Sequence, residues 1–213
     1  MTKISTRQRV LNKSSELFNR FGIEAVSIGQ ISEALQISTG NLTYHFKKKA
    51  DLVTAHIAEL ENLLLSRVEG FPMVSNPKSF GEAYVNLLGL TLKFRFLFVG
   101  STYILQNDLV EATRYKQLIE VTKKTFVRQI KRLTEEGFMK PIQKPYDVEM
   151  LIDSIWWQWL GWMLVTQVDV AESRKTEEKR LADAVLHILF LFHHYIDPEF
   201  FKAVQLELKK AVR

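Results

Sequence analysis

Apolar residues recur at spacings of three and four along most of the chain, which is the periodicity of one face of an α-helix. In residues 4–21, for example, Val10, Leu17 and Phe18 share such a face, and Gly22 follows as a C-terminal glycine. No segment alternates apolar and polar residues in the way a half-buried strand does. The pattern therefore predicts an all-α protein.

Short helices are expected in the first part of the chain. Ser27 and Ser38 each stand just before a short apolar-periodic segment, in the position of an N-cap. A longer helix is expected to open at Lys49 and to run toward Arg67. Two short helices joined by the tight turn "QIS" form a helix-turn-helix pattern.

The stretch 69–79 is rich in Pro, Gly, Ser and Asn and is the expected domain boundary. Later helices are expected near 80–98, 110–136, 147–168, 174–195 and from Pro198 onward. The predicted organisation is an N-terminal helix-turn-helix domain followed by a second, larger helical domain. The first comprises residues 1–50 with the start of a connecting helix at 49–69, and the second comprises 75–213.

Charge is concentrated at one end of the chain. Residues 1–49 hold eight Lys or Arg and three acidic residues, so their excess of five equals the net charge of the whole protein. Residues 50–213 hold 21 basic and 21 acidic residues. A segment with the entire positive excess is expected to bind a polyanion, most often a phosphate backbone. A solvated basic face without a partner is the alternative that charge alone leaves open.

Other sequence features narrow the class of protein. The chain has no cysteine for a thiolate metal site or a disulfide. The apolar stretch Ile155–Val165 is shorter than the roughly 18–20 residues of a membrane span, and the polar N-terminus does not resemble a secretory signal. His187, His193 and His194 lack a converging spacing, and no nucleophile or phosphate-loop motif is present. We therefore expect a cytoplasmic protein that is not an enzyme and has no cofactor, metal site or membrane contact.

The segment "STGNLTYHF" (38–46) combines small polar residues with aromatic ones. Small residues at the N-terminus of a helix allow close approach to the major groove, and their hydroxyl and amide groups can contact base edges. Leu42 and Phe46, four residues apart, can anchor such a helix to its neighbours. An asparagine in a turn can equally be an Asx-turn residue. The surrounding positive charge favours the DNA-reading interpretation.

Residues 16–35 (ELFNRFGIEAVSIGQISEAL) and 37–52 (ISTGNLTYHFKKKADL) closely resemble the DNA-binding domain of the tetracycline-repressor (TetR) family. The resemblance implies that Ser27 caps the second helix and touches phosphate, and that Lys49 meets phosphate at the start of the fourth helix. Thr43 departs from the family, which usually has tyrosine there, and Tyr44 is expected to take over part of that contact. The expected DNA-binding residues are Ser27, Ser38, Thr39, Gly40, Asn41, Thr43, Tyr44, His45 and Lys49.

The helical remainder resembles the family's C-terminal domain in helix order. That resemblance implies a small apolar or aromatic effector and a homodimer formed through the helices near 147–168 and 174–195. A tryptophan-rich helix that is apolar on more than one face fits an interface, although its side chains can also fill a core. The expected effector contacts are Phe94, Phe98, Tyr103, Phe126, Trp156 and Trp159. The expected interface residues are Trp157, Trp162, Leu181, Val185, Ile188 and Phe192.

These features together predict a ligand-responsive transcriptional regulator. We expect a repressor that binds a near-palindromic operator in double-stranded DNA as a homodimer. The alternative is a helical small-molecule-binding protein or enzyme that has a basic N-terminus and no specific DNA target.

Overall fold

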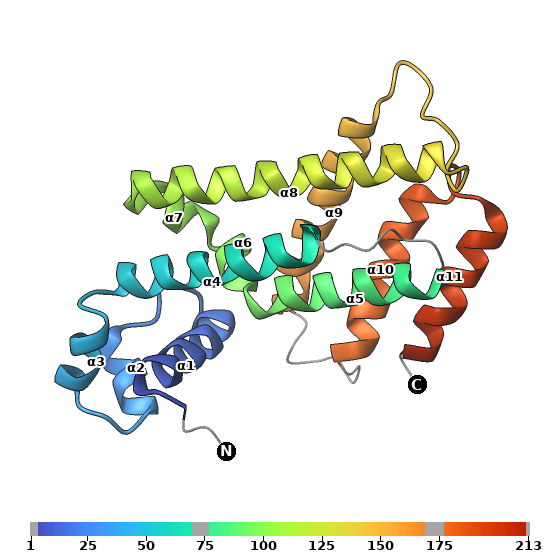
Figure 1. Cartoon of the computed structure of the whole chain (residues 1–213). Coiled ribbons are helices and arrows are strands. Elements are labelled where there is room, and N and C mark those ends of the chain that lie inside the picture. The colour runs from blue at the N-terminus through green and yellow to red at the C-terminus, as the bar shows by residue number, and fades with distance from the viewer. Residues whose placement is uncertain (1–3, 70–76, 169–176, 212–213) are drawn as a thin grey trace. The chain divides into compact units, whose positions relative to one another are not determined.

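A computed structural model describes residues 4–69, 77–168 and 177–211, and within these ranges it contains helices and no strand (Figure 1). The expectation of an all-α protein is confirmed. Most of the expected boundary at 69–79 and of the linker "VDVAES" (168–173) lies outside the described residues. The helices are α1 (Thr6–Phe21), α2 (Ile28–Ala34), α3 (Thr39–His45), α4 (Lys49–Glu69), α5 (Pro77–Lys93), α6 (Arg95–Val99), α7 (Ser101–Asn107), α8 (Leu109–Glu135), α9 (Val148–Val168), α10 (Glu177–Phe192) and α11 (Pro198–Ala211).

Serine side chains start the first three helices. The backbone N–H of Gln8 donates to the Oγ of Ser5 at α1 over 3.2 Å. At α2, Ser27 and Gln30 form a reciprocal capping box, in which each side chain accepts from the other residue's backbone N–H. At α3, Ser38 accepts from the N–H of Asn41. The two N-caps predicted from the sequence are therefore confirmed.

The chain divides into two compact units. Unit 1 comprises Met1–Leu63 with Leu92–Leu118, and unit 2 comprises Leu64–Thr91 with Ile119–Arg213. This division by packing differs from a simple split of the sequence near residue 75. Helices α6 and α7 and the first part of α8 pack with the N-terminal helices, because apolar residues of the 94–104 segment are buried in unit 1.

The core of unit 1 forms where α1 packs against α2, α3 and α6. Phe18 of α1 and Ile31 of α2 are fully buried there. Leu42 and Phe46 are also buried, at 0 % and 3 % exposure, and they fix α3 against the rest of unit 1. Burying one such side chain contributes about 1.5–3 kcal/mol, which is the main force that holds so short a helix in place.

The prediction of a single helix near 80–98 is wrong in one respect, because the helix is interrupted after Lys93. The side chain of Asn19, on α1, donates to the carbonyl of Lys93 over 2.8 Å and accepts from the N–H of Phe96 over 3.0 Å. These contacts satisfy backbone groups at the break. Helix α5 therefore ends at Lys93 and α6 begins at Arg95, although the apolar spacing of the sequence continues across the junction.

In unit 2, α10 packs against both α9 and α11. Met163, Leu189 and Val204 lie in its core, with 0–1 % of their surface exposed. Met139 and Ile196 form an isolated antiparallel bridge, which joins the segment after α8 to the turn before α11. No helix among the described residues is long and apolar enough to cross a membrane.

Gly100, between α6 and α7, lies against the turn that follows α1. A Cβ atom at this position would lie 2.6 Å from the carbonyl oxygen of Phe96 and 3.1 Å from Cδ1 of Ile23. We therefore expect Gly100→Ala to lower the free energy of unfolding by roughly 1–3 kcal/mol, as overpacking does.

The matched control for this substitution is Gly89→Ala within α5, where an added Cβ meets no atom within 4 Å. Alanine there raises helix propensity and should raise the free energy of unfolding by up to about 1 kcal/mol. Urea denaturation followed by circular dichroism measures both changes. Equal stability of the two variants would show that the close approach at Gly100 is not a constraint.

Candidate nucleic-acid interface

Helix α3 presents its small polar residues outward. Thr39, Gly40 and Asn41 are exposed, whereas Leu42 on the opposite side is completely buried. The hydroxyl of Thr43 donates to the carbonyl of Gly40 over 3.2 Å and is half-buried. The N-terminal part of α3 therefore presents an exposed, polar surface whose hydroxyl and amide groups could contact a nucleic acid.

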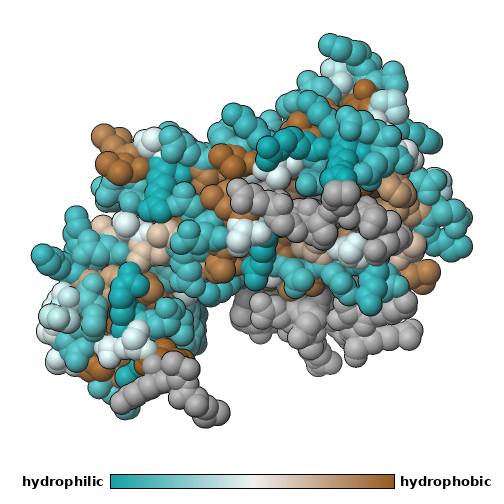
Figure 2. Space-filling view, viewed as in Figure 1, coloured by the Kyte–Doolittle hydropathy of each residue, from teal (hydrophilic) through white to brown (hydrophobic). Residues whose placement is uncertain are grey.

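The C-terminal end of α3 carries two aromatic side chains. Tyr44 is 85 % exposed, and the ring of His45 lies edge-on to it with centroids 5.1 Å apart. An exposed tyrosine is not held by core packing, so its hydroxyl is available to a phosphate oxygen. Figure 2 shows that the surface around α2 and α3 is largely hydrophilic.

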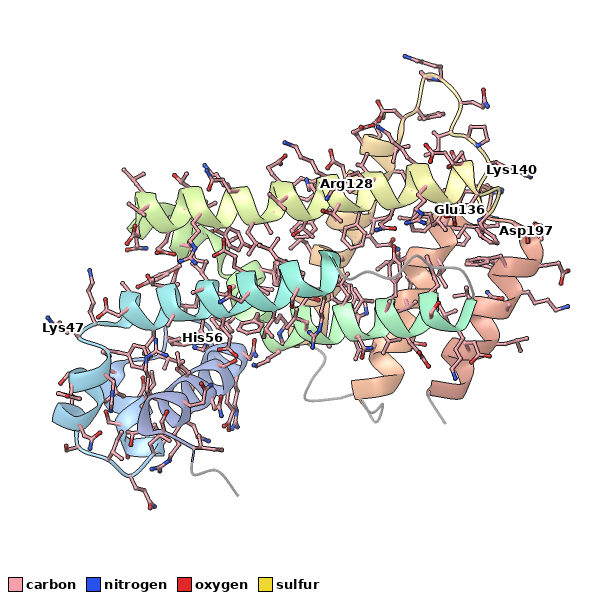
Figure 3. All side chains as sticks on the ribbon, viewed as in Figure 1. Lys47, His56, Arg128, Glu136, Lys140 and Asp197 are labelled. Atoms are coloured by element: carbon pink, nitrogen blue, oxygen red, sulfur yellow. The ribbon has the colours of Figure 1, made fainter. Side chains whose placement is uncertain are left out.

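The three lysines that follow α3 have different environments. Lys47 and Lys48 are exposed, and Figure 3 shows Lys47 pointing away from the ribbon. The ammonium of Lys49 instead donates to the carbonyls of Ile23 and Glu24, over 2.8 and 3.0 Å. Partial burial lowers the pKa of Lys49, and the nearby Glu24 opposes that change. Lys49 therefore joins the start of α4 to the turn after α1, and its predicted phosphate contact stays a prediction.

Unit 1 also contains a buried histidine, His56, which sequence reasoning did not identify. Nε2 of His56, on α4, lies 2.9 Å from the Oγ of Ser14 on α1. The same hydroxyl lies 3.0 Å from the carbonyl of Leu11. Nδ1 of His56 is buried with no partner in the described structure.

Three phenylalanine rings surround the His56 imidazole. The rings of Phe18, Phe94 and Phe96 lie with their centroids 5.0–6.3 Å from it. Burial, helped by the positive charge of Lys93, lowers the pKa of His56 to about 3. The imidazole is thus a neutral part of the core that joins α1, α4 and α6. The sequence did contain a signal for this burial, because His56 lies four residues from both Leu52 and Leu60 and so shares their apolar helix face.

The six residues expected to contact an effector do not fall in one unit. Phe94, Phe98 and Tyr103 belong to unit 1 and the other three to unit 2. Phe94 packs on His56, and Phe98 lies near Tyr115 at a centroid distance of 6.4 Å. The unit 2 members are Phe126, Trp156 and Trp159.

Trp159, in unit 2, combines deep burial with an unpaired donor. Only 4 % of it is exposed, and its ring stacks on Trp162 with centroids 4.8 Å apart. Its indole Nε1–H finds no acceptor among the residues that the structure describes. Trp156 lies under the ammonium of Lys123, at 5.8 Å from the ring centroid.

The six expected interface residues divide by exposure. Trp157 is 68 % exposed on α9, and Trp162 is half-buried against Trp159. The other four pack inside the protomer with at most 9 % of their surface exposed, and they therefore do not face outward. These are Leu181, Val185, Ile188 and Phe192. The exposed side of α10 instead carries Phe190, at 66 % exposure.

A groove of about 680 Å³ lies between α8 and α9 in unit 2. Its lining includes the apolar side chains of Val121, Val127 and Ile152 together with acidic and basic residues. Among the charged ones, Lys123 and Asp153 form an ion pair at 2.8 Å. None of the six expected effector residues lines the groove. Within the described ranges, no cluster of His, Asp or Glu could hold a metal ion.

An exposed polar helix, anchored by buried apolar residues and preceded by a capped short helix, defines a helix-turn-helix DNA-binding protein. Two family models match the chain. The one described as "Bacterial regulatory proteins, tetR family" covers residues 10–55, and the one described as "Bacterial transcriptional repressor" covers residues 74–204. The chain belongs to the TetR family of bacterial transcriptional regulators. It is a DNA-binding transcriptional regulator.

Individual relatives agree with this assignment. The transcriptional regulator AcrR of Shigella flexneri is 32% identical over 75 residues, a match that spans 32% of this chain and only 35% of AcrR. The probable regulator YttP of Bacillus subtilis is 19% identical over 165 residues, which cover 65% of this chain and 80% of YttP.

Solved structures show the same fold. A TetR-family regulator from Marinobacter aquaeolei VT8 has a TM-score of 0.79 at 22% identity, over 99% of this chain and 100% of that one. The regulator AibR, solved in complex with isovaleryl coenzyme A and operator DNA, has a TM-score of 0.63 at 15% identity, over 88% of this chain and 98% of AibR.

Because folded His56 is neutral, we expect the free energy of unfolding to fall as the pH is lowered. In the unfolded chain a histidine binds a proton below about pH 6.5, whereas folded His56 stays neutral until its pKa of about 3. Acid therefore favours the unfolded state in this window, by at most about 1.4 kcal/mol per pH unit. The contribution of His56 is complete above pH 6.5 and is progressively lost toward pH 3.

The control is His56→Gln, which keeps a side-chain amide as hydrogen-bond partner for Ser14 but does not titrate. Urea denaturation at pH 7 and pH 4.5 should show a larger loss of stability for the natural protein than for the variant. Identical pH dependence of the two proteins would mean that His56 takes up a proton in the folded state as easily as in the unfolded one.

Proposed function

We propose that this protein is an effector-responsive repressor that binds a near-palindromic operator in double-stranded DNA as a homodimer. The observation that carries the proposal is the exposed polar N-terminal surface of α3. It belongs to the segment 1–49, which holds the whole positive excess of the chain. In a dimer of this class the two recognition helices enter successive major grooves, about 34–36 Å apart.

Base reading is assigned to the N-terminal part of α3. Asn41 is the strongest candidate, because an exposed amide can make two hydrogen bonds with adenine. Contacts to the sugar–phosphate backbone are assigned to the side chains that surround this reading surface. Besides Asn41, the proposed DNA contacts are Ser27, Ser38, Thr39, Gly40, Thr43, Tyr44 and His45, with Lys47, Lys48 and Lys49 as the cations.

Dimerisation is assigned to the exposed apolar side chains of α9 and α10. Trp157 and Leu164 on α9, and Phe190 on α10, are each more than half exposed. Helices α9 and α10 pack against each other within unit 2. Large exposed apolar side chains on two packed helices are typical of a surface that another protein covers. A second copy of this chain would pair α9 and α10 with their counterparts in a four-helix bundle.

The effector is assigned to the interior of unit 2, beside Phe126, Trp156 and Trp159. The buried indole N–H of Trp159 supports this choice, because an unpaired buried donor is costly and a ligand oxygen would satisfy it. Among the described residues of unit 2, the buried polar side chains are threonines and no charged group is buried. A neutral apolar or aromatic effector with a hydrogen-bond acceptor matches such an interior. The structure of AibR with a small molecule and operator DNA shows that the fold can hold both.

The protein acts by binding and not by catalysis, without a cofactor, in the cytoplasm where its operator is accessible. The rival function is a helical small-molecule-binding protein or enzyme with no specific DNA target. Selection of binding sequences from a random pool of duplexes, with excess competitor DNA, separates the two. Recovery of a two-fold-related sequence supports the repressor, and recovery of no preferred sequence refutes it.

Asn41→Ala should change which bases the protein prefers. On variants of the selected duplex, we expect it to lose about 1–3 kcal/mol of discrimination at one base pair in each half-site. Asn62→Ala, which removes an exposed asparagine from α4, is the matched control and should leave the ranking unchanged. Fluorescence anisotropy with labelled duplexes measures both. An unchanged ranking for Asn41→Ala would remove this residue from base reading.

Trp157→Asp should produce a monomer, because it places a charge in the proposed apolar interface. Leu206→Asp, at an exposed apolar position on α11, is the control and should remain dimeric. Sedimentation velocity gives the mass, and circular dichroism shows whether the fold persists. A folded Trp157→Asp dimer would place the interface on another face of unit 2.

A further inference from the structure

We infer that Asn19 is a positioning residue for DNA binding, whose side-chain amide fixes the recognition helix α3 to helices α6 and α7 as one rigid body. The inference rests on the proposed operator binding. All the contacts that carry it lie within unit 1.

The Asn19 side chain occupies the break between α5 and α6 from the last part of α1. Its Nδ2 donates to the carbonyl of Lys93 over 2.8 Å, and its Oδ1 accepts from the backbone N–H of Phe96 over 3.0 Å. The guanidinium of Arg95 donates to the backbone carbonyl of Asn19 over 2.8 Å. Ser15, one turn earlier on α1, donates to the same Lys93 carbonyl over 3.2 Å. Side chains from both sides thus hold α1 to this junction.

The same segment touches the DNA-binding helices at further points. Phe18 packs on Phe96 at a centroid distance of 5.4 Å. An added Cβ at Gly100 would lie 3.1 Å from the side chain of Ile23, so α6 approaches the turn after α1 closely. Lys49 lies 5.5 Å from the ring centroid of Tyr103 on α7. Residues 93–103 therefore contact α1, the turn after it and the start of α4.

The orientation of α3 follows from these contacts, because α1 packs directly against both α2 and α3. Removing the amide of Asn19 leaves the Lys93 carbonyl and the Phe96 N–H without this partner. The contact between α1 and the junction of α5 with α6 is then less rigid. If helices α1–α3 are held less rigidly, DNA binding must restrict more of their conformations, and the affinity for DNA falls. Asn19 needs no contact with DNA to have this effect.

The test uses the absence of cysteine from the sequence, which allows labels at introduced cysteines without background. Cysteines replace Ala34 on α2 and Gln106 on α7, both of which are exposed. Each carries a spin label, and an excess of unlabelled chain ensures one labelled protomer per dimer. Double electron–electron resonance then gives the distribution of distances between α2 and α7, with and without the selected duplex.

The natural protein should give one narrow distribution that operator DNA does not alter. Asn19→Leu, which keeps the side-chain size but removes both hydrogen bonds, should broaden the distribution and weaken operator binding about 5–20-fold. Asn19→Asp keeps the acceptor for Phe96 and loses the donor for Lys93, so its effects should be intermediate. Asn62→Leu is the control and should change neither quantity. Circular dichroism of all variants verifies that they fold.

An unchanged distance distribution in both Asn19 variants would overturn the inference, and so would a broadened distribution with unchanged operator affinity. If Asn19→Leu does not fold, the distance distribution and operator affinity of Asn19→Asp alone test the inference. The distance measurement on free protein does not depend on DNA. Failure of the natural protein to select any operator would therefore count against the proposed function. It would be distinguishable from failure of the inference about Asn19, which the distance distributions of the free proteins test.

Discussion

The hydrogen bond between neutral His56 and Ser14, enclosed by three phenylalanine rings, is the constraint on which the DNA-binding unit depends. Helices α2 and α3 have seven residues each, far fewer than the roughly 12–15 that an isolated helix needs to be even marginally stable in water. They persist because α1 packs against both of them, and His56 joins α1 to α4 at the core. The imidazole does this without a buried charge, since burial lowers the pKa of His56 to about 3.

This arrangement separates the two tasks of the recognition helix. Leu42 and Phe46 supply the apolar anchor, so the exposed N-terminal part of α3 can consist of small polar groups. Rigid support then matters more than helix propensity, because base contacts depend on geometry within a fraction of an ångström. The contacts of Asn19 with Lys93 and Phe96 extend that support to α6. The residues proposed to read DNA and the residues that hold them are therefore different sets.

Local signals predicted the elements well, and tertiary contacts explain where prediction stopped. Ser27 and Ser38 cap helices as expected, because an N-cap is decided by residues close in sequence. Periodicity could not show the break after Lys93, since it depends on an asparagine 74 residues earlier in the chain. Nor could it show which side of α10 faces the core, so Val185 and Ile188 were expected at an interface and are buried. Lys49 was expected at phosphate, yet its ammonium also holds backbone carbonyls of the preceding turn.

The central claim is that the basic N-terminal unit binds specific duplex DNA as part of a dimer. The most direct test is a titration of the protein against duplexes from the flanks of its own gene, with excess competitor, repeated over a range of salt concentrations. The account predicts saturable binding by two protomers per site, with affinity falling steeply as salt rises because phosphate contacts release counterions. Weak binding that competitor DNA abolishes at every salt concentration, on these duplexes and on those selected from a random pool, would contradict it.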